Sequence, residues 1–163
     1  MRGGIQAAIQ DGFPISSEVA IPNVVSSYPM DSWQCPTIDL EGMDALIQKD
    51  DFVVIDVRES QRFSGATEPI DLVAGHIPGA TNIPFTTNLD ENGFFLSPEE
   101  LKTKYQNTFE SIPVENRVVH CGSGVTACHT LLALAIADLP LPKLYVGSWS
   151  EWSRNDKLIA TDI

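Results

Sequence analysis

The sequence predicts an α/β fold built on a parallel sheet. Short apolar, β-branched runs alternate along the chain with longer stretches of helical character, and this alternation is typical of βαβ units. The clearest run, FVVIDV at 52–57, is almost wholly apolar, as a strand buried on both faces of a parallel sheet requires. The chain has 163 residues, of which 43% are hydrophobic and 20% charged, and this composition suits one globular domain of that class.

Each expected element has a local reason. Asp39 is a candidate N-cap for a helix over 40–48, in which the apolar residues share one face. Ser97 begins a cap, first-turn proline and capping-box pattern (SPEE), which predicts a helix over 98–109. The other expected elements are strands over 52–57, 80–83, 117–120 and 143–146, a helix over 126–139 that ends before Pro140, and a helix over 149–155.

Residues 1–36 are expected to form an N-terminal arm or linker, and residues 37–163 the folded domain. Prolines at 14, 22, 29 and 36 are spaced along residues 14–36 of the arm. Proline at this density stops helices and favours an extended segment that runs over a surface.

The charge and cysteine content exclude several classes of function. Ten basic and 22 acidic residues give a net charge of −12, which opposes broad contact with nucleic acid or with an anionic membrane surface. No apolar run approaches the roughly 20 residues of a membrane span, and residues 1–13 lack the apolar core of a signal peptide. The cysteines (Cys35, Cys121 and Cys128) are an odd number at unpatterned spacing, so we expect no disulfide framework, no metal site and a cytoplasmic location.

One loop carries the chemistry that the sequence predicts. VVHCGSGVT at 118–126 runs from a strand through a glycine-rich loop into a helix, and Cys121 is the first residue after the strand. The positive end of that helix and the surrounding N–H groups favour a thiolate, and they would also hold an anion or a sulfur atom on Cys121. We therefore expect a nucleophilic cysteine, and a buried structural cysteine in a tight turn is the competing interpretation. The backbone groups in question are those of Gly122, Ser123, Gly124, Val125 and Thr126.

A cysteine phosphatase is disfavoured by the length and charge of this loop. Such enzymes need an arginine six residues after the cysteine to clamp phosphate, and Ala127 occupies that position. No arginine occurs anywhere in 118–153. A short loop without a cation suits a smaller group on sulfur, such as a persulfide.

The neighbours of the loop are assigned to packing. Cys128 lies on the helix after the loop, and Trp149 and Trp152 are three residues apart on the last expected helix, so all three are expected in the core. His120 precedes Cys121 on a strand, where neighbouring side chains point to opposite faces, so His120 need not touch the thiolate.

Several stretches of the chain, in order, resemble the rhodanese family of sulfurtransferases, over about 37–159. They are DVR at 56–58, RFSG at 62–65, EP at 68–69, GHIPGA at 75–80, CGSGVTAC at 121–128 and YVGSWSEW at 145–152. The resemblance implies a rhodanese-like domain with a parallel sheet of about five strands and helices on both faces. It also implies that Cys121 takes sulfur from a small anionic donor, 3-mercaptopyruvate in the first place, and passes it as a persulfide to a thiophilic acceptor (a thiol, cyanide or a protein thiol). No cofactor is implied.

Further roles follow from the same resemblance. Arg62 matches an arginine that binds the carboxylate of the donor, with a surface ion pair as the competing role. The backbone of 122–126 would hold the sulfur, and Ser123 would assist proton transfer at the carbonyl of the substrate or else shape the loop. Ile70 stands where relatives usually have a second arginine, so half of the expected carboxylate clamp is missing. Supporting roles, rather than chemical ones, are expected of Asp56, Arg58 and His76.

Two alternatives to a mercaptopyruvate sulfurtransferase stay open. A thiosulfate sulfurtransferase would have the same fold, but the loop lacks the basic residues that suit a doubly charged donor. A non-catalytic binding or regulatory module is the other alternative, and the presence of Cys121 counts against it, because such modules often lose the cysteine.

The front of the chain resembles its end. Residues 3–15 align with 147–159 without a gap, so that GGIQAA lies over GSWSEW, and 1–15 therefore resembles the tail of a preceding rhodanese domain. We expect the chain to be the second half of a tandem, completed by a first rhodanese domain or by a homodimer partner. An intact single-domain protein is the alternative. A thiol or a thioredoxin-like protein is a further expected partner, as sulfur acceptor.

Overall fold

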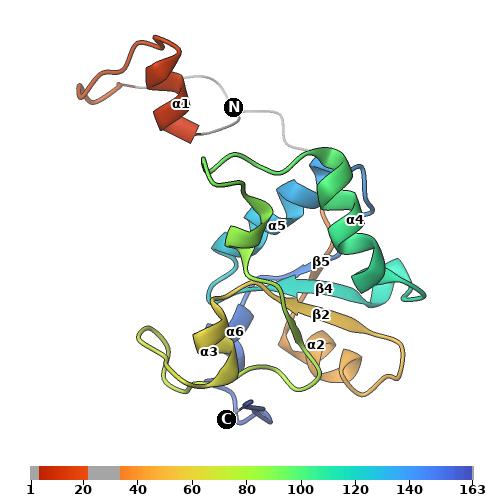
Figure 1. The fold of residues 1–163 in the computed structure, drawn as a ribbon. Coiled ribbons are helices and arrows are strands. Elements are labelled where there is room, and N and C mark those ends of the chain that lie inside the picture. The colour runs from red at the N-terminus through yellow and green to blue at the C-terminus, as the bar shows by residue number, and fades with distance from the viewer. Residues whose placement is uncertain (1–3, 22–33, 163) are drawn as a thin grey trace.

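A five-stranded parallel sheet between two layers of helices forms the centre of the computed structural model, which describes residues 4–21 and 34–162 (Figure 1). The strands lie in the order β1-β5-β4-β2-β3, and every neighbouring pair is parallel. The predicted α/β class and parallel sheet are confirmed. The strands are β1 (Thr37–Ile38), β2 (Val53–Asp56), β3 (Thr81–Asn82), β4 (Arg117–His120) and β5 (Lys143–Tyr145).

The helices cover both faces of the sheet, as expected (Figure 1). α2 (Leu40–Leu46) and α6 (Ser148–Trp152) pack on one face, and α4 (Pro98–Phe109) and α5 (Val125–Ile136) pack on the other. The remaining helical segments are α1 (Gly4–Gln10), α3 (Ser60–Ser64) and the 3-10 turns η1 (Phe85–Asn88) and η2 (Val114–Asn116). No helix in the described part of the chain is both long and apolar enough to cross a bilayer.

β2 shows why the sheet needs helices on both sides. Its residues Val53 and Ile55, with Val57 just after them, contact the cluster beneath α4 and α5, whereas Val54 contacts the cluster beneath α2 and α6. Successive side chains of a strand point to opposite faces, so an unbroken apolar run buries both. β4 behaves in the same way, and it lies between β2 and β5 near the middle of the sheet.

The bounds of the elements follow local signals closely in some places and not in others. α4 covers 98–109 as predicted, because the Ser97–Glu100 capping box forms. α5 ends at Ile136, three residues before the expected end, and Asp138 takes a left-handed conformation (φ 53°) well before Pro140. β1 and α3 were not predicted, since two strand residues and five helical residues are too short to produce a periodic pattern.

Two of the three residues that were assigned to the core are buried, and the third is not. Trp149 and Trp152 are fully buried, which confirms their assignment to packing. The expectation for Cys128 is wrong, because this side chain is exposed. It lies on the solvent side of α5, whereas its neighbours Ala127 and Thr130 are fully buried. The boundary between the arm and the domain stays a prediction, and Pro22 and Pro29 of the arm lie outside the described residues.

Candidate functional site

Cys121 lies at the carboxyl end of the sheet, directly after β4. The residue is 2% exposed, and it lines a cavity of about 220 Å³. The carboxyl ends of parallel strands are where ligands bind in α/β folds, because the loops from neighbouring strands meet there. The cavity is lined by Arg62, Ile70, Asp71, Cys121, Gly122, Ser123, Val125, Thr126 and Ser150. The expected loop and Arg62 are therefore brought together, and Gly124 is the only loop position from 122 to 126 that is not in the lining.

Only one of the two glycines in the loop is required by the geometry around it. Gly124 adopts φ +80°, and a Cβ there would lie 2.9 Å from the carbonyl oxygen of Val146, so both its backbone angle and its surroundings demand glycine. A Cβ on Gly122 would meet the Arg62 guanidinium at 3.7 Å, which is ordinary contact. Among the described residues, the N–H groups of Gly122, Ser123 and Gly124 donate no hydrogen bond to the protein. They are free to bind an anion beside the sulfur atom.

The segment after β5 holds the cysteine loop in place. The N–H of Cys121 donates to Ser148 Oγ (3.2 Å), and this hydroxyl donates to the carbonyl of Tyr145 (2.8 Å). The N–H of Trp149 donates to the Cys121 carbonyl (3.0 Å), and that of Ser150 to the Gly122 carbonyl (2.9 Å). Both carbonyls and the Cys121 N–H are thus occupied by the protein, and what remains for a ligand is the set of loop N–H groups.

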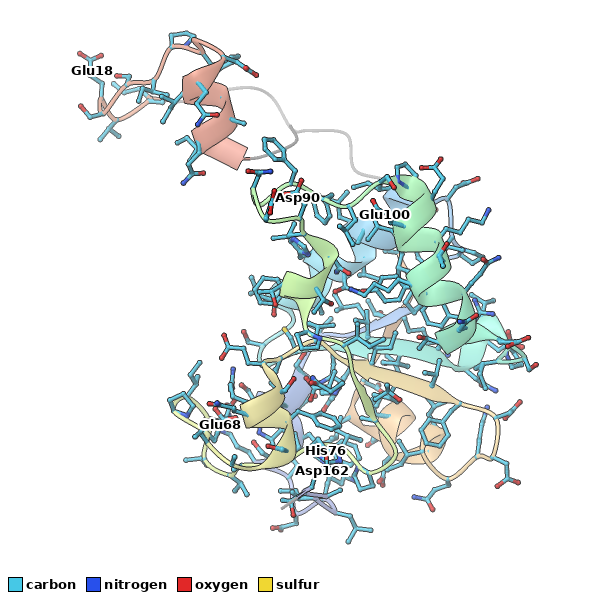
Figure 2. The ribbon with its side chains drawn as sticks, viewed as in Figure 1. Glu18, Glu68, His76, Asp90, Glu100 and Asp162 are labelled. Carbon is cyan, nitrogen blue, oxygen red and sulfur yellow. The ribbon has the colours of Figure 1, made fainter. Side chains whose placement is uncertain are left out.

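Arg62 lies beside the loop and is already paired. Its Nε donates to Glu68 Oε1 (2.9 Å), and its Nη2 lies 2.7 Å from the same oxygen and 3.2 Å from Asp71 Oδ2. Glu68 lies on the loop that follows α3 (Figure 2). Asp71 also accepts from Ser150 Oγ (2.6 Å) and from Arg154 Nη1 (3.1 Å). The structure therefore places Arg62 both in the cavity and within an ion-pair network.

Asp56 and Arg58 lie beneath this network, outside the cavity. Arg58 contacts Asp56 through Nη2 (2.7 Å) and Nε, and it also donates to Glu68 Oε2 (3.2 Å) and to the Gly75 carbonyl (2.7 Å). Both residues are almost fully buried, and the Arg58 guanidinium lies over the Trp149 ring. The network thus ties the end of β2 to the loop after α3, which supports the structural role expected of both.

The two histidines near the site are packed. His76 Nδ1 is 2.8 Å from the carbonyl of Phe63, its ring stacks on the Phe63 ring, and its Nε2 approaches Asp162 at 3.9 Å (Figure 2). His120 is fully buried, with Nδ1 3.1 Å from the Cys121 carbonyl and Nε2 3.6 Å from Asp56 Oδ2. Burial lowers the pKa of His120 below its ordinary value, although the Asp56 charge opposes this shift. Neither histidine lines the cavity.

Three residues of the site were missed in the sequence: Asp71, Ser148 and Ser150. Asp71 follows the position where the second arginine was expected, and both serines lie within the YVGSWSEW stretch. An acidic residue next to an expected cation site was an available signal. The roles of the serines depend on hydrogen bonds to the Cys121 loop, which no local pattern reveals.

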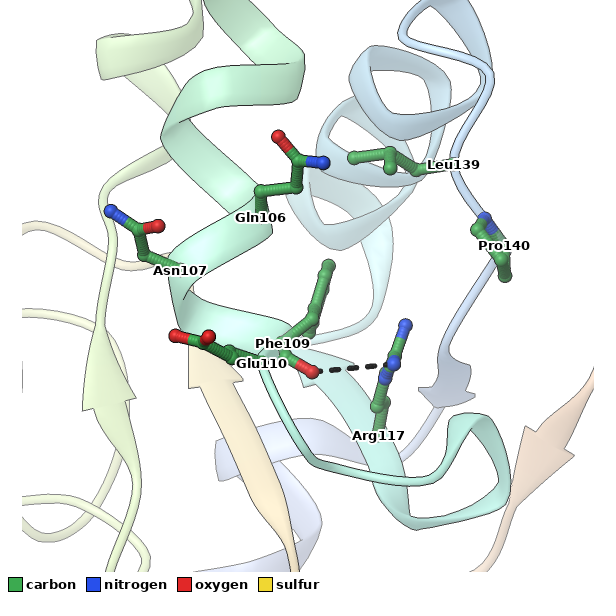
Figure 3. Close-up of a pocket in the computed structure, with 7 residues that line it drawn as sticks. All are labelled: Gln106, Asn107, Phe109, Glu110, Arg117, Leu139 and Pro140. Carbon is green, nitrogen blue, oxygen red and sulfur yellow. Dashed lines mark hydrogen bonds between the residues drawn. The ribbon is translucent and has the colours of Figure 1, made fainter.

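Another cavity, of about 450 Å³, lies far from the cysteine, where the end of α4 faces the start of β4 (Figure 3). Arg117 in its wall donates to the carbonyls of Ile112 and Phe109 and stacks on the Phe109 ring. These contacts occupy the guanidinium and hold the end of α4 against the start of β4. In the described ranges, no group of three or more histidine, cysteine or acidic side chains could hold a metal ion.

Comparison with known proteins places the chain in a family. Residues 39–155 match the sequence model of the rhodanese-like domain. The chain is 50% identical over 115 residues to a probable 3-mercaptopyruvate sulfurtransferase of Pseudomonas aeruginosa, which covers 71% of this chain and 40% of the relative. It is 34% identical over 153 residues to the thiosulfate sulfurtransferase of Gallus gallus, which covers 93% of this chain and 52% of the relative. The chain thus spans about half the length of these curated relatives, or less.

Solved structures agree on the fold. The Tum1 protein of Saccharomyces cerevisiae superposes with a TM-score of 0.64 and 28% identity over 78% of this chain and 47% of that one. A structure of EanB in complex with ergothioneine superposes with a TM-score of 0.85 over all of this chain and 41% of that one. Its identity is 20%, so this likeness concerns the fold alone.

Proposed function

Because the chain belongs to the rhodanese-like domain family, we propose that it is a sulfurtransferase that carries sulfur as a persulfide on Cys121. The observation that carries the proposal is the position of Cys121: it lines a cavity of about 220 Å³, next to loop N–H groups that bind nothing else in the described protein. The names of the relatives support the same activity.

The proposed reaction needs only the cysteine and the loop. The Cys121 thiolate attacks the sulfur of 3-mercaptopyruvate, a sulfur–sulfur bond forms, and the carbon–sulfur bond breaks. The electron pair of that bond leaves on carbon as the enolate of pyruvate, which then takes a proton. In the second step, an acceptor thiolate attacks the outer sulfur, and the Cys121 thiolate is the leaving group. We expect the N–H groups of Gly122, Ser123 and Gly124, which donate to no other group in the described protein, to hold the outer sulfur between the steps.

We favour 3-mercaptopyruvate over thiosulfate as the donor. Among the described residues, Arg62 is the only cation in the lining of the cavity, and two carboxylates already pair with it. Position 70, where a second cation would reinforce it, is isoleucine. Thiosulfate is the second candidate, supported by the relatives of that name. In that reaction the thiolate takes the outer sulfur of thiosulfate, and sulfite leaves with the bonding electron pair.

We also propose that a first rhodanese domain or a second copy of the chain covers the mouth of the cavity. Ile70 and Val125 line it and are 71% and 72% exposed, although both are large and apolar. Exposed apolar patches of this kind often mark interaction surfaces. The sulfur acceptor would be a thiol or a thioredoxin-like protein, and the proposed compartment is the cytoplasm.

Intact-protein mass spectrometry tests the function. Reduced protein is incubated with 3-mercaptopyruvate or with thiosulfate, for wild type and Cys121→Ser. We expect wild type to gain the mass of one sulfur atom, and Cys121→Ser to gain none because it lacks the nucleophile. Cys128→Ser is the matched control: it removes an exposed cysteine outside the cavity and should keep the gain. Sulfur on Cys121→Ser would contradict the proposed carrier, and no sulfur on wild type, even with a first rhodanese domain added, would favour a binding module.

A further inference from the structure

Asp71 is a buried carboxylate in the wall of the cavity that holds Cys121. Its side chain is 2% exposed. It accepts from Ser150 Oγ at 2.6 Å, from Arg154 Nη1 at 3.1 Å and from Arg62 Nη2 at 3.2 Å. Ser150 also donates its N–H to the Gly122 carbonyl, so Asp71 is fixed to the cysteine loop through one residue. A carboxylate that accepts three such hydrogen bonds is held in one place, and it faces the space that the proposed sulfur donor must enter.

The surrounding charges cancel. The network alternates in sign from Asp56 through Arg58, Glu68, Arg62 and Asp71 to Arg154, so three acidic and three basic groups sum to zero. Within the described residues, Arg62 Nη1 has no hydrogen-bond partner, whereas Nε and Nη2 are occupied by carboxylates. The cavity thus offers an anion one guanidinium nitrogen and the loop N–H groups, with a fixed negative charge nearby.

We propose that Asp71 is a specificity-determining residue that makes this site prefer donors with one negative charge over donors with two. The inference rests on the proposed function and names the donor class of the same site. The repulsion between a fixed carboxylate and a donor grows in proportion to the donor charge. In free energy, a dianion therefore loses twice what a monoanion loses, and in binding or rate constants the factor for a dianion is the square of that for a monoanion.

Protection of Cys121 from alkylation measures this preference without any sulfur transfer. The probe is iodoacetamide, which is uncharged, and the protecting anions are pyruvate (one charge) and sulfate (two charges) at constant ionic strength. We expect Asp71→Asn to lower the half-protecting concentration about fivefold for pyruvate and about 25-fold for sulfate, taking one unit charge in a well-screened pocket. A merely structural role of Asp71 would change the half-protecting concentrations of pyruvate and sulfate by similar factors. The difference between the two factors is therefore the decisive result.

A second variant should act in the opposite direction. Arg154 contacts Asp71 from the solvent side, is 44% exposed and does not line the cavity. Arg154→Gln removes a positive charge behind Asp71, so the half-protecting concentrations should rise, and more for sulfate than for pyruvate. Asp50→Asn is the matched control, because it makes the same change in formal charge as Asp71→Asn at an exposed position before β2, at the end of the strand away from the cavity. It should leave the half-protecting concentrations of both anions unchanged.

The same variants are then assayed with 3-mercaptopyruvate, a monoanion at neutral pH because its thiol is protonated, and with thiosulfate, a dianion. Asp71→Asn should raise kcat/KM for thiosulfate by about the square of the factor for 3-mercaptopyruvate. Equal factors for the mono- and dianion in the protection assay, or half-protecting concentrations that rise for both anions, would overturn the role of Asp71. Protection that follows charge, in a wild type that accepts no sulfur, would instead contradict the proposed function and leave this inference standing.

Discussion

At the scale of single residues, Ser148 shows how the site is held. It is a fully buried serine in a left-handed conformation (φ 53°), and its hydroxyl joins the Cys121 N–H to the Tyr145 carbonyl. A residue other than glycine is strained in this conformation, and it persists only where its contacts compensate. The strain and the hydrogen bonds act in opposite directions, so two substitutions can separate them.

We expect Ser148→Ala to lower the free energy of unfolding by about 1–3 kcal/mol, because a buried N–H and a buried carbonyl lose their partner while the strain remains. Ser148→Gly loses the same hydrogen bonds but relieves the left-handed strain, so it should be about 1 kcal/mol more stable than the alanine variant. Urea denaturation of the three proteins measures the order. An alanine variant more stable than the glycine variant would show that the backbone angle is unstrained.

At the scale of elements, the turn between β4 and α5 depends on a close approach of two loops. Gly124 lies at the N-terminus of α5, and the carbonyl of Val146 fills the space where its Cβ would be. The Ser97 capping box of α4 is different, since all its partners lie within four residues. One helix therefore begins where local hydrogen bonds place it, and the other where a distant strand end allows it.

Alanine at Gly124 tests this close approach, and Gly93→Ala is its matched control. Gly93 has nearly the same φ (+78° against +80°), but no atom lies within 4 Å of the place that its Cβ would take, so it reports the backbone strain alone. We expect Gly93→Ala to lower the free energy of unfolding by about 1 kcal/mol, and Gly124→Ala by about 2–4 kcal/mol because the Val146 carbonyl must also move. Equal losses in urea denaturation would show that Val146 yields freely.

At the scale of the whole molecule, His120 and His129 make the free energy of unfolding depend on pH. Burial lowers the pKa of His120, and burial together with the charge of Lys104 lowers the pKa of His129, whose ring lies between Phe85 and Phe95. Both histidines are therefore neutral in the folded protein at a pH where the unfolded chain takes up protons. The stability that they contribute is present above their ordinary pKa, which is about 6.5, and is lost as the pH falls below it.

We expect the free energy of unfolding to fall between pH 7 and pH 5, with a slope of at most about 1.4 kcal/mol per pH unit for each histidine. His120→Gln and His129→Gln should each flatten the dependence, since glutamine does not titrate. Urea denaturation at intervals of pH checks both variants. An unchanged slope in the double variant would assign the acid sensitivity to other groups.

Local interactions made much of this protein predictable from residue order. The apolar run of β2, the capping box of α4 and the Cys121 loop each depend on neighbours along the chain, and the α/β class and parallel sheet follow from their alternation. The expected roles of Arg62 and the loop residues stay predictions, although the fold brings them to one cavity.

Other features exist because the fold brings distant residues together. The Ser150–Asp71 hydrogen bond joins residues 79 positions apart, and β1 is a strand because it pairs with β5. The exposure of Cys128 likewise depends on which side of α5 faces the sheet. Such contacts follow from where parallel strands end in space rather than from any pattern along the chain, so the charge balance around the cysteine emerges only when the sheet has formed.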